Sequence, residues 1–165
     1  MAVSTYHELK KKYHKVCLIP HTETLPYDFF SPSKEIKNLR MQALSKLLGD
    51  EIHILVISVQ ALVSPCPDKA HLLPFDLLKT KAHIDRKNLI SGLAKTGYER
   101  KDIVQEVGEF ALRGSIIDIY GTGYDEPIRI EINESKIESL RTFDPTSQIT
   151  TKKISSFSAI PPYEY

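Results

Sequence analysis

Apolar residues in the first third of the chain alternate between helical spacing and short continuous runs. Residues 4–15 predict a short helix with Ser4 or Thr5 as its cap, and residues 16–19 follow as a short buried strand. Residues 33–48 have clear helical spacing, with Ser33 as the cap and Gly49 as the terminator. The run IHILVISV at 52–59 is typical of a strand covered on both faces. This part of the chain is therefore expected to be α/β.

Prolines and turn residues interrupt this pattern twice. Residues 20–33 have too many of them for regular structure but contain apolar side chains, so we expect a loop pinned to the core. The segment Ser64-Pro65-Cys66-Pro67-Asp68 is the clearest break, because prolines on both sides of one residue stop a helix or a central strand. We expect a domain boundary there. A strand near 72–81 and a helix from Asp85 to Gly97 are expected beyond it.

The spacing changes to a period of two after Tyr98. It predicts an antiparallel meander whose candidate strands are 103–107, 109–113, 115–120, 128–134 and 136–143. Residues 149–165 are polar at first and end with apolar and proline residues, so we expect a segment that returns toward the first domain. The expected domains are therefore 1–68, 69–148 and 149–165. The expected fold class is α/β followed by α+β.

Two arginines are expected on the solvent face of the meander. Ile128, Ile130 and Ile132 alternate with polar residues, so Arg129 should point outward. Strict alternation from Ile117 and Ile119 would place Arg113 on the dry face. A one-residue bulge at Gly114 would move Arg113 to the face of Arg129.

Arg129 also has a simpler possible role. A hairpin through residues 121–126 could bring Asp118 and Glu131 beside it, and Arg129 would then form a surface ion pair contributing less than about 1 kcal/mol.

Charge and composition give no sign of a nucleic-acid or membrane surface. The chain has 22 Lys+Arg against 21 Asp+Glu, which argues for local partner recognition. Cys17 and Cys66 have no metal-ligand spacing and are expected to be free thiols in a reducing cytoplasm. No window reaches 18 apolar residues and no secretion signal is present, so we expect a cytoplasmic protein without a membrane span.

The sequence contains no pattern typical of a catalytic or cofactor site. The glycine-rich phosphate-binding motifs G-x-x-x-x-G-K-[ST] and G-x-G-x-x-G do not occur in the sequence. The turn at 121–123 is expected to be a plain hairpin. The six histidines lack zinc-binding spacing, and no nucleophile elbow exists. We therefore expect no cofactor, no metal and no catalytic residue, and interpret the chain as a protein-binding module.

Three stretches resemble one known family: ETLPYDFFSPS at 23–33, GEFALRGSIIDIY at 108–120 and IESLRTFDPTSQ at 137–148. In this order they are similar to the N-terminal region of the bacterial transcription-repair coupling factors. The resemblance implies a truncated, degenerate copy of the first domain of UvrB with a smaller inserted domain that binds UvrA. It also implies that the regions that bind RNA polymerase and DNA lie outside this chain. The ATP-driven translocase motor of that family lies outside it as well.

The resemblance places the UvrA-binding residues at Arg113 and Arg129. Four residues beyond Arg129 the family usually has an aromatic side chain, whereas this chain has Asn133. An asparagine supplies less buried area than an aromatic anchor. The alternative is a UvrB-type DNA-binding fragment. Residues 72–148 argue against it, because 13 Asp+Glu outnumber 11 Lys+Arg.

Overall fold

The computed structural model describes residues 2–21, 33–48, 52–74 and 76–164, which form two compact units. The first unit is Met1–Leu73 with Glu164, and the second is Pro74–Tyr163 with Tyr165. The division lies after the proline segment 64–68, because the helix that follows this segment packs against the first unit. Within the described residues, no helix is long and apolar enough to cross a membrane.

The first unit is a pair of parallel strands with short helices, as the α/β pattern predicts. Val16 pairs with Ile54 and Ile19 with Ile57 in a parallel register. Val56 is buried but Leu55 is 37% exposed, so the expectation of a strand covered on both faces is wrong. The elements are α1 (Ala2–Lys12), β1 (Val16–Ile19), α2 (Lys34–Leu48), β2 (Ile54–Ile57), α3 (Val59–Leu62) and α4 (Lys69–Leu72).

Several predictions in the first unit are confirmed and others differ. Strand β1 has the predicted bounds, and Ser33 caps α2 by accepting a hydrogen bond from the backbone N–H of Ile36 at 3.3 Å. Helix α1 begins before Ser4, so neither Ser4 nor Thr5 is its cap. Most of the predicted loop at 20–33, and the terminator Gly49, lie outside the described residues.

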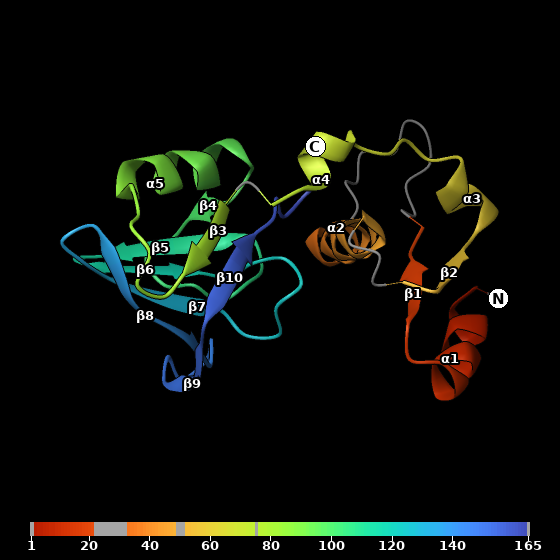
Figure 1. Cartoon of the computed structure of the whole chain (residues 1–165). Helices are drawn as coiled ribbons and strands as arrows, with labels where there is room; N and C mark the ends of the chain where they lie inside the picture. Colours follow the sequence, from red (N-terminus) through yellow and green to blue (C-terminus); the bar gives the residue numbers. More distant parts are fainter. Residues whose placement is uncertain (1, 22–32, 49–51, 75, 165) are drawn as a thin grey trace. The chain divides into compact units, whose positions relative to one another are not determined.

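The second unit is built on a 6-stranded sheet in the order β4-β5-β6-β7-β8-β9 (Figure 1). The pairs from β5 to β9 are antiparallel, as the period of two predicts, whereas β4 runs parallel to β5. The strands are β4 (Glu99–Arg100), β5 (Glu109–Arg113), β6 (Ile116–Ile119), β7 (Ile128–Asn133), β8 (Lys136–Phe143) and β9 (Thr150–Ile154).

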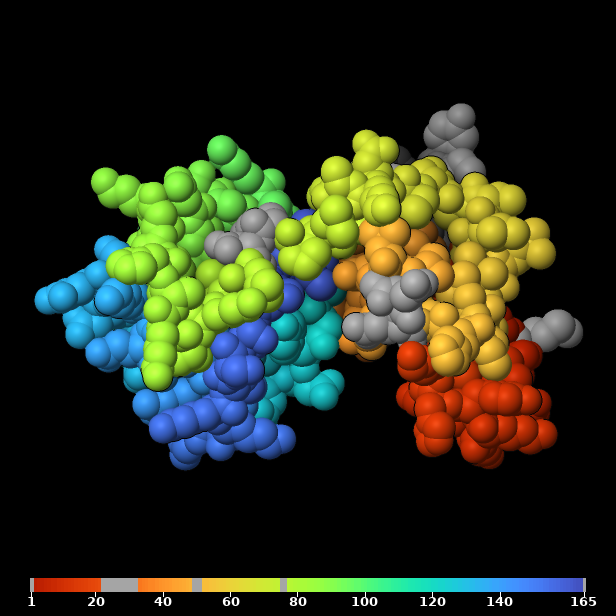
Figure 2. All heavy atoms as spheres, viewed as in Figure 1, coloured from red at the N-terminus to blue at the C-terminus, as the bar shows by residue number. Residues whose placement is uncertain are grey.

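One face of this sheet is covered by a helix and a two-stranded ribbon. The ribbon pairs β3 (Asp76–Lys79) with β10 (Ser156–Ala159) in antiparallel register, and the helix is α5 (Arg86–Lys95). In Figure 1 the ribbon crosses in front of the strands of the sheet and α5 lies above them, and the blue atoms of β10 are at the front in Figure 2. Their buried side chains join those of the sheet in one core that includes Leu78, Leu89, Leu93, Phe110, Ile117, Ile119, Ile128, Ile130, Ile137, Leu140, Phe157 and Ala159.

Both ends of α5 form as the sequence predicts. Asp85 Oδ1 accepts from the backbone N–H groups of Lys87 and Asn88 at 2.9 and 3.1 Å. Gly97 has a φ of +95°, and the N–H of Tyr98 donates to the carbonyl of Leu93 at the closing turn.

The second unit differs from the predictions in three places. Residues 103–107 form no strand, because the N–H groups of Gln105 and Glu106 donate to the Glu109 carboxylate instead of to a ladder. The short strand β4 was not predicted. Residues 149–165 contain two strands that were not predicted, β9 and β10, and they belong to the second unit through Tyr163.

Candidate functional site

The turn at Gly114-Ser115 decides which face of the sheet carries Arg113. Arg113 pairs with Ile116, Leu112 with Ile117 and Phe110 with Ile119, without a register shift. A two-residue hairpin loop places the residues on either side of it opposite one another, so they share a face. The predicted bulge at Gly114 is therefore wrong and unnecessary, because Gly114 lies in the turn, with a φ of +58°.

The register places Arg113 and Arg129 on the same face of the sheet, which we call the outer face. Arg129 pairs with Asp118, and Asp118 pairs with Ala111 on β5, two residues before Arg113. The opposite face carries Ile128 and Ile130, both fully buried in the core. Arg129 thus points away from the core, as the alternation predicts.

Arg129 is held by a buried carboxylate and an aromatic ring. Its Nε and Nη2 donate to Asp118 Oδ1 and Oδ2 at 2.8 and 2.9 Å, and its Nη1 donates to the carbonyl of Gln148 at 3.3 Å. The guanidinium lies 4.4 Å from the ring centroid of Phe143. The hydrogen bonds to Asp118 raise the pKa of Arg129, an effect that burial partly offsets.

The ion-pair role considered for Arg129 is thus present, but it is not a surface pair. The Asp118 side chain is 0% exposed and that of Arg129 16%. A charged pair with two parallel hydrogen bonds at such a site has more influence on stability than an exposed pair.

Arg113 and Asn133 are both exposed and only lightly bonded. Arg113 Nη2 donates to the carbonyl of Asp102 at 3.3 Å, and Asn133 Nδ2 donates to Glu138 Oε1 at 3.1 Å. Asn133 lies at the end of β7, on the strand that carries Arg129. The three residues of the predicted site therefore lie on two strands of one sheet, Arg113 on β5 and Arg129 and Asn133 on β7.

Part of the outer face is covered by loops rather than by solvent. Val104 and Phe143 are fully buried there together with Ala111, and Tyr120 packs against them. Val104 lies in the loop between β4 and β5, and Gln148 lies in the loop between β8 and β9. Gln148 Nε2 joins these two loops by donating to the carbonyl of Val104 at 3.2 Å. The outer face, which was expected to be exposed to solvent, is thus exposed only beyond this small second core.

The sequence analysis missed three residues at this site: Arg141, Phe143 and Gln148. Arg141 pairs directly with Arg129 across β7 and β8. In the sequence, the apolar residues Ile137 and Leu140 are three positions apart, which breaks the period of two and was the available signal. Both side chains are buried, because β8 contains a register shift. That shift sets the orientation of the residues that follow.

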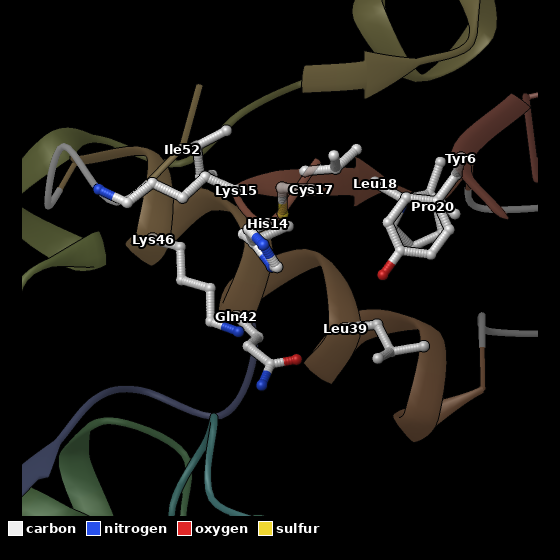
Figure 3. A pocket seen from close by; sticks show the side chains of 12 residues that line it. Tyr6, His14, Lys15, Cys17, Leu18, Pro20, Leu39, Gln42, Lys46 and Ile52 are labelled. Atoms are coloured by element: carbon white, nitrogen blue, oxygen red, sulfur yellow. The ribbon is translucent and has the colours of Figure 1, made fainter. Parts of the chain in front are cut away.

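The first unit contains a hollow that the sequence did not predict. Its volume is about 420 Å³, and it lies between α1, β1 and α2 (Figure 3). His14, Gln42 and Lys46 line one part of it, while Leu39 and Pro20 line another. Burial raises the pKa of the Cys17 thiol beside it, an effect that the charge of Lys46 partly offsets. Among the described residues, no group of His, Cys, Asp or Glu side chains could hold a metal ion.

Comparison with known proteins gives a consistent result for the second unit. The UvrB interaction domain family matches residues 77–165. The chain is 36% identical over 153 residues to the transcription-repair-coupling factor of Haemophilus influenzae, covering 91% of this chain and 13% of that protein.

Two further relatives show the same relationship. The transcription-repair-coupling factor of Escherichia coli is 33% identical over 147 residues, covering 87% of this chain and 12% of that protein. UvrABC system protein B of Thermosipho africanus is 32% identical over 131 residues, with 79% of this chain and 20% of that protein covered. The chain therefore spans only a small part of the length of these relatives.

Proposed function

Since the chain belongs to the UvrB interaction domain family, we propose that it is a protein-binding module that recruits UvrA in transcription-coupled nucleotide excision repair. The observation that carries this proposal is the position of Arg113 and Arg129 on one sheet face, inside the segment that matches the family. In this proposal the chain binds its partner and performs no catalytic step. Residues 1–68 are proposed to be a truncated first domain of the UvrB type, into which the UvrA-binding domain is inserted.

The chemistry of the outer face suits a protein partner that presents carboxylates. A guanidinium offers five N–H donors in a planar fork that matches a carboxylate. Arg113 donates one of these to the carbonyl of Asp102, 3.3 Å away, and is exposed. We therefore propose Arg113 as the more accessible anchor, with Arg129 beside it and Asn133 as a polar contact at the rim.

A DNA phosphate backbone fits this face less well. Glu131, Glu134 and Glu138 interrupt the cations around Asn133 and Arg141. A surface that follows phosphates needs a continuous positive track. A protein surface with single, separated carboxylates meets mixed charges of this kind more readily.

Isothermal titration calorimetry with purified UvrA tests the proposal. We expect Arg113→Ala to weaken the complex by about 1 to 3 kcal/mol if it is a central contact. The exposed position of Arg113 means that its replacement should leave the fold intact. Arg129→Ala should weaken binding too, but it also strands the buried Asp118, so its folding must be checked by circular dichroism.

Arg100→Ala is the control, because Arg100 is an exposed arginine of the same unit, on β4 at the edge of the sheet. Its affinity should equal that of the wild type. Equal binding by wild type and by the folded Arg113→Ala protein would contradict the proposed site, and absence of wild-type binding would contradict the proposed partner.

A further inference from the structure

Arg141 extends the row of cations on the outer face. It pairs with Arg129 on β7 and with Lys153 on β9, so three cationic residues lie side by side on adjacent strands. Like charges directly opposite one another in a sheet destabilise it unless anions compensate them. Two carboxylates compensate this row among the described residues: Asp118 binds Arg129, and Glu131 lies near Arg141.

The two arginines differ in how completely they are bonded. Arg129 makes two hydrogen bonds to Asp118 and one to Gln148, and stacks on Phe143. Arg141 Nη2 lies 3.4 Å from Glu131 Oε2, and that carboxylate oxygen also accepts from the hydroxyl of Ser139. The Nε of Arg141 is enclosed and has no hydrogen-bond partner among the described residues. Arg141 therefore makes fewer hydrogen bonds than Arg129 to the described residues.

Arg141 also lines an open hollow of about 680 Å³ beside Glu131, Asn133, Ser139 and Lys153. Its side chain is 34% exposed, about twice the 16% of Arg129. A partner side chain that enters this hollow reaches Arg141 and Asn133 together. The mixed charges of the lining favour one inserted carboxylate over a chain of phosphates.

We propose that Arg141 is a direct contact for a partner carboxylate, and that Arg129 acts mainly by positioning the face through Asp118 and Phe143. The proposal rests on the proposed function, because it takes UvrA as the partner that supplies the carboxylate. It assigns a role to a residue outside the set formed by Arg113, Arg129 and Asn133.

The test is calorimetry of the whole chain with UvrA at low and at moderate salt. Arg141→Gln, which keeps a polar side chain but removes the charge and the guanidinium fork, should weaken binding by about tenfold or more, in the range of interface hot spots. The affinity of Arg141→Lys should lie between those of the wild type and of Arg141→Gln, since a lysine keeps the charge but not the planar guanidinium fork. The difference in affinity between the wild type and Arg141→Gln should shrink at higher salt, because salt screens the attraction that Arg141 provides in the wild type.

Arg86→Gln is the matched control, because Arg86 is a half-buried arginine on α5, which covers the opposite face of the sheet. Its affinity should stay within about twofold of the wild type, as surface substitutions away from an interface do. Urea unfolding of each variant establishes that it is folded at the temperature of the titration.

The outcomes separate the two proposals. If Arg141→Gln binds as well as the wild type while Arg113→Ala binds weakly, the role of Arg141 is overturned and the proposed function stands. If Arg86→Gln loses as much affinity as Arg141→Gln, general charge attraction explains the loss and Arg141 is not a specific contact. If the wild type does not bind UvrA, the proposed function fails, and the role of Arg141 fails with it.

Discussion

Asp118 and Arg129 form the most enclosed charged pair among the described residues of the second unit. The carboxylate is fully buried between strands, and both of its oxygens accept hydrogen bonds from one guanidinium. Removing one member of such a pair leaves the other without compensation, which costs more than the pair contributes. The pair therefore fixes the geometry of the outer face more than it adds to net stability.

Asp118→Asn is expected to lower the free energy of unfolding by about 2 to 3 kcal/mol, because charged hydrogen bonds to a buried group are lost. Urea unfolding at neutral pH measures this. Asp125→Asn makes the same charge change at an exposed position of the same unit and should cost less than about 0.5 kcal/mol. Equal effects of the two substitutions would show that Asp118 is not structurally important.

At the scale of single residues, the sequence predicted directions better than contacts. The alternation around Arg129 correctly placed its side chain away from the core, and Asp118 was recognised as a possible partner. The stacking on Phe143 was not foreseeable from alternation, because it depends on the shifted registers at both edges of β8. Arg113 was placed on the correct face by an incorrect route.

Among the elements, α5 was the most predictable because its signals are local. A cap, an apolar stripe and a terminating glycine all lie within residues 85–97, and each forms the expected contact. Elements of two to four residues, such as β4 and α4, contain too few positions to show a period. Strand β10 was missed because its partner β3 lies far away in the sequence, and only that pairing makes it a strand.

Asp85→Ala should destabilise the second unit by about 1 kcal/mol, since α5 loses the side-chain acceptor for two backbone N–H groups. Thermal or urea unfolding followed by circular dichroism detects the change. Asp68→Ala is an informative control, because Asp68 precedes α4 without a capping hydrogen bond from its side chain. A similar loss from both substitutions would argue against capping as the cause.

The whole chain consists of two units that differ in how much core they contain. The second unit has the large cluster that joins the sheet, α5 and the ribbon. The first has one pair of parallel strands among the described residues, and several apolar side chains of α3 and its flank are more than half exposed. The sequence predicted a domain boundary at the proline segment 64–68, but composition alone could not show that α4, which follows this segment, packs on α2.

A protein that contains only residues 74–165 is expected to fold by itself with one cooperative transition, because its core is built from its own residues. Far-ultraviolet circular dichroism during urea unfolding measures this. The fragment should retain the wild-type affinity for UvrA, since the outer face lies within it. A gradual transition would show that the second unit depends on the first.

The end of the 6-stranded sheet at β9 also limits how another chain can approach. Its sequence TTKKI places Lys152 and Lys153 on an exposed edge strand. Edge lysines oppose the pairing of a foreign strand, because their charges would have to be brought close to an incoming backbone. Recognition by strand addition is therefore disfavoured at this edge, and a partner is directed to side-chain contacts across the face.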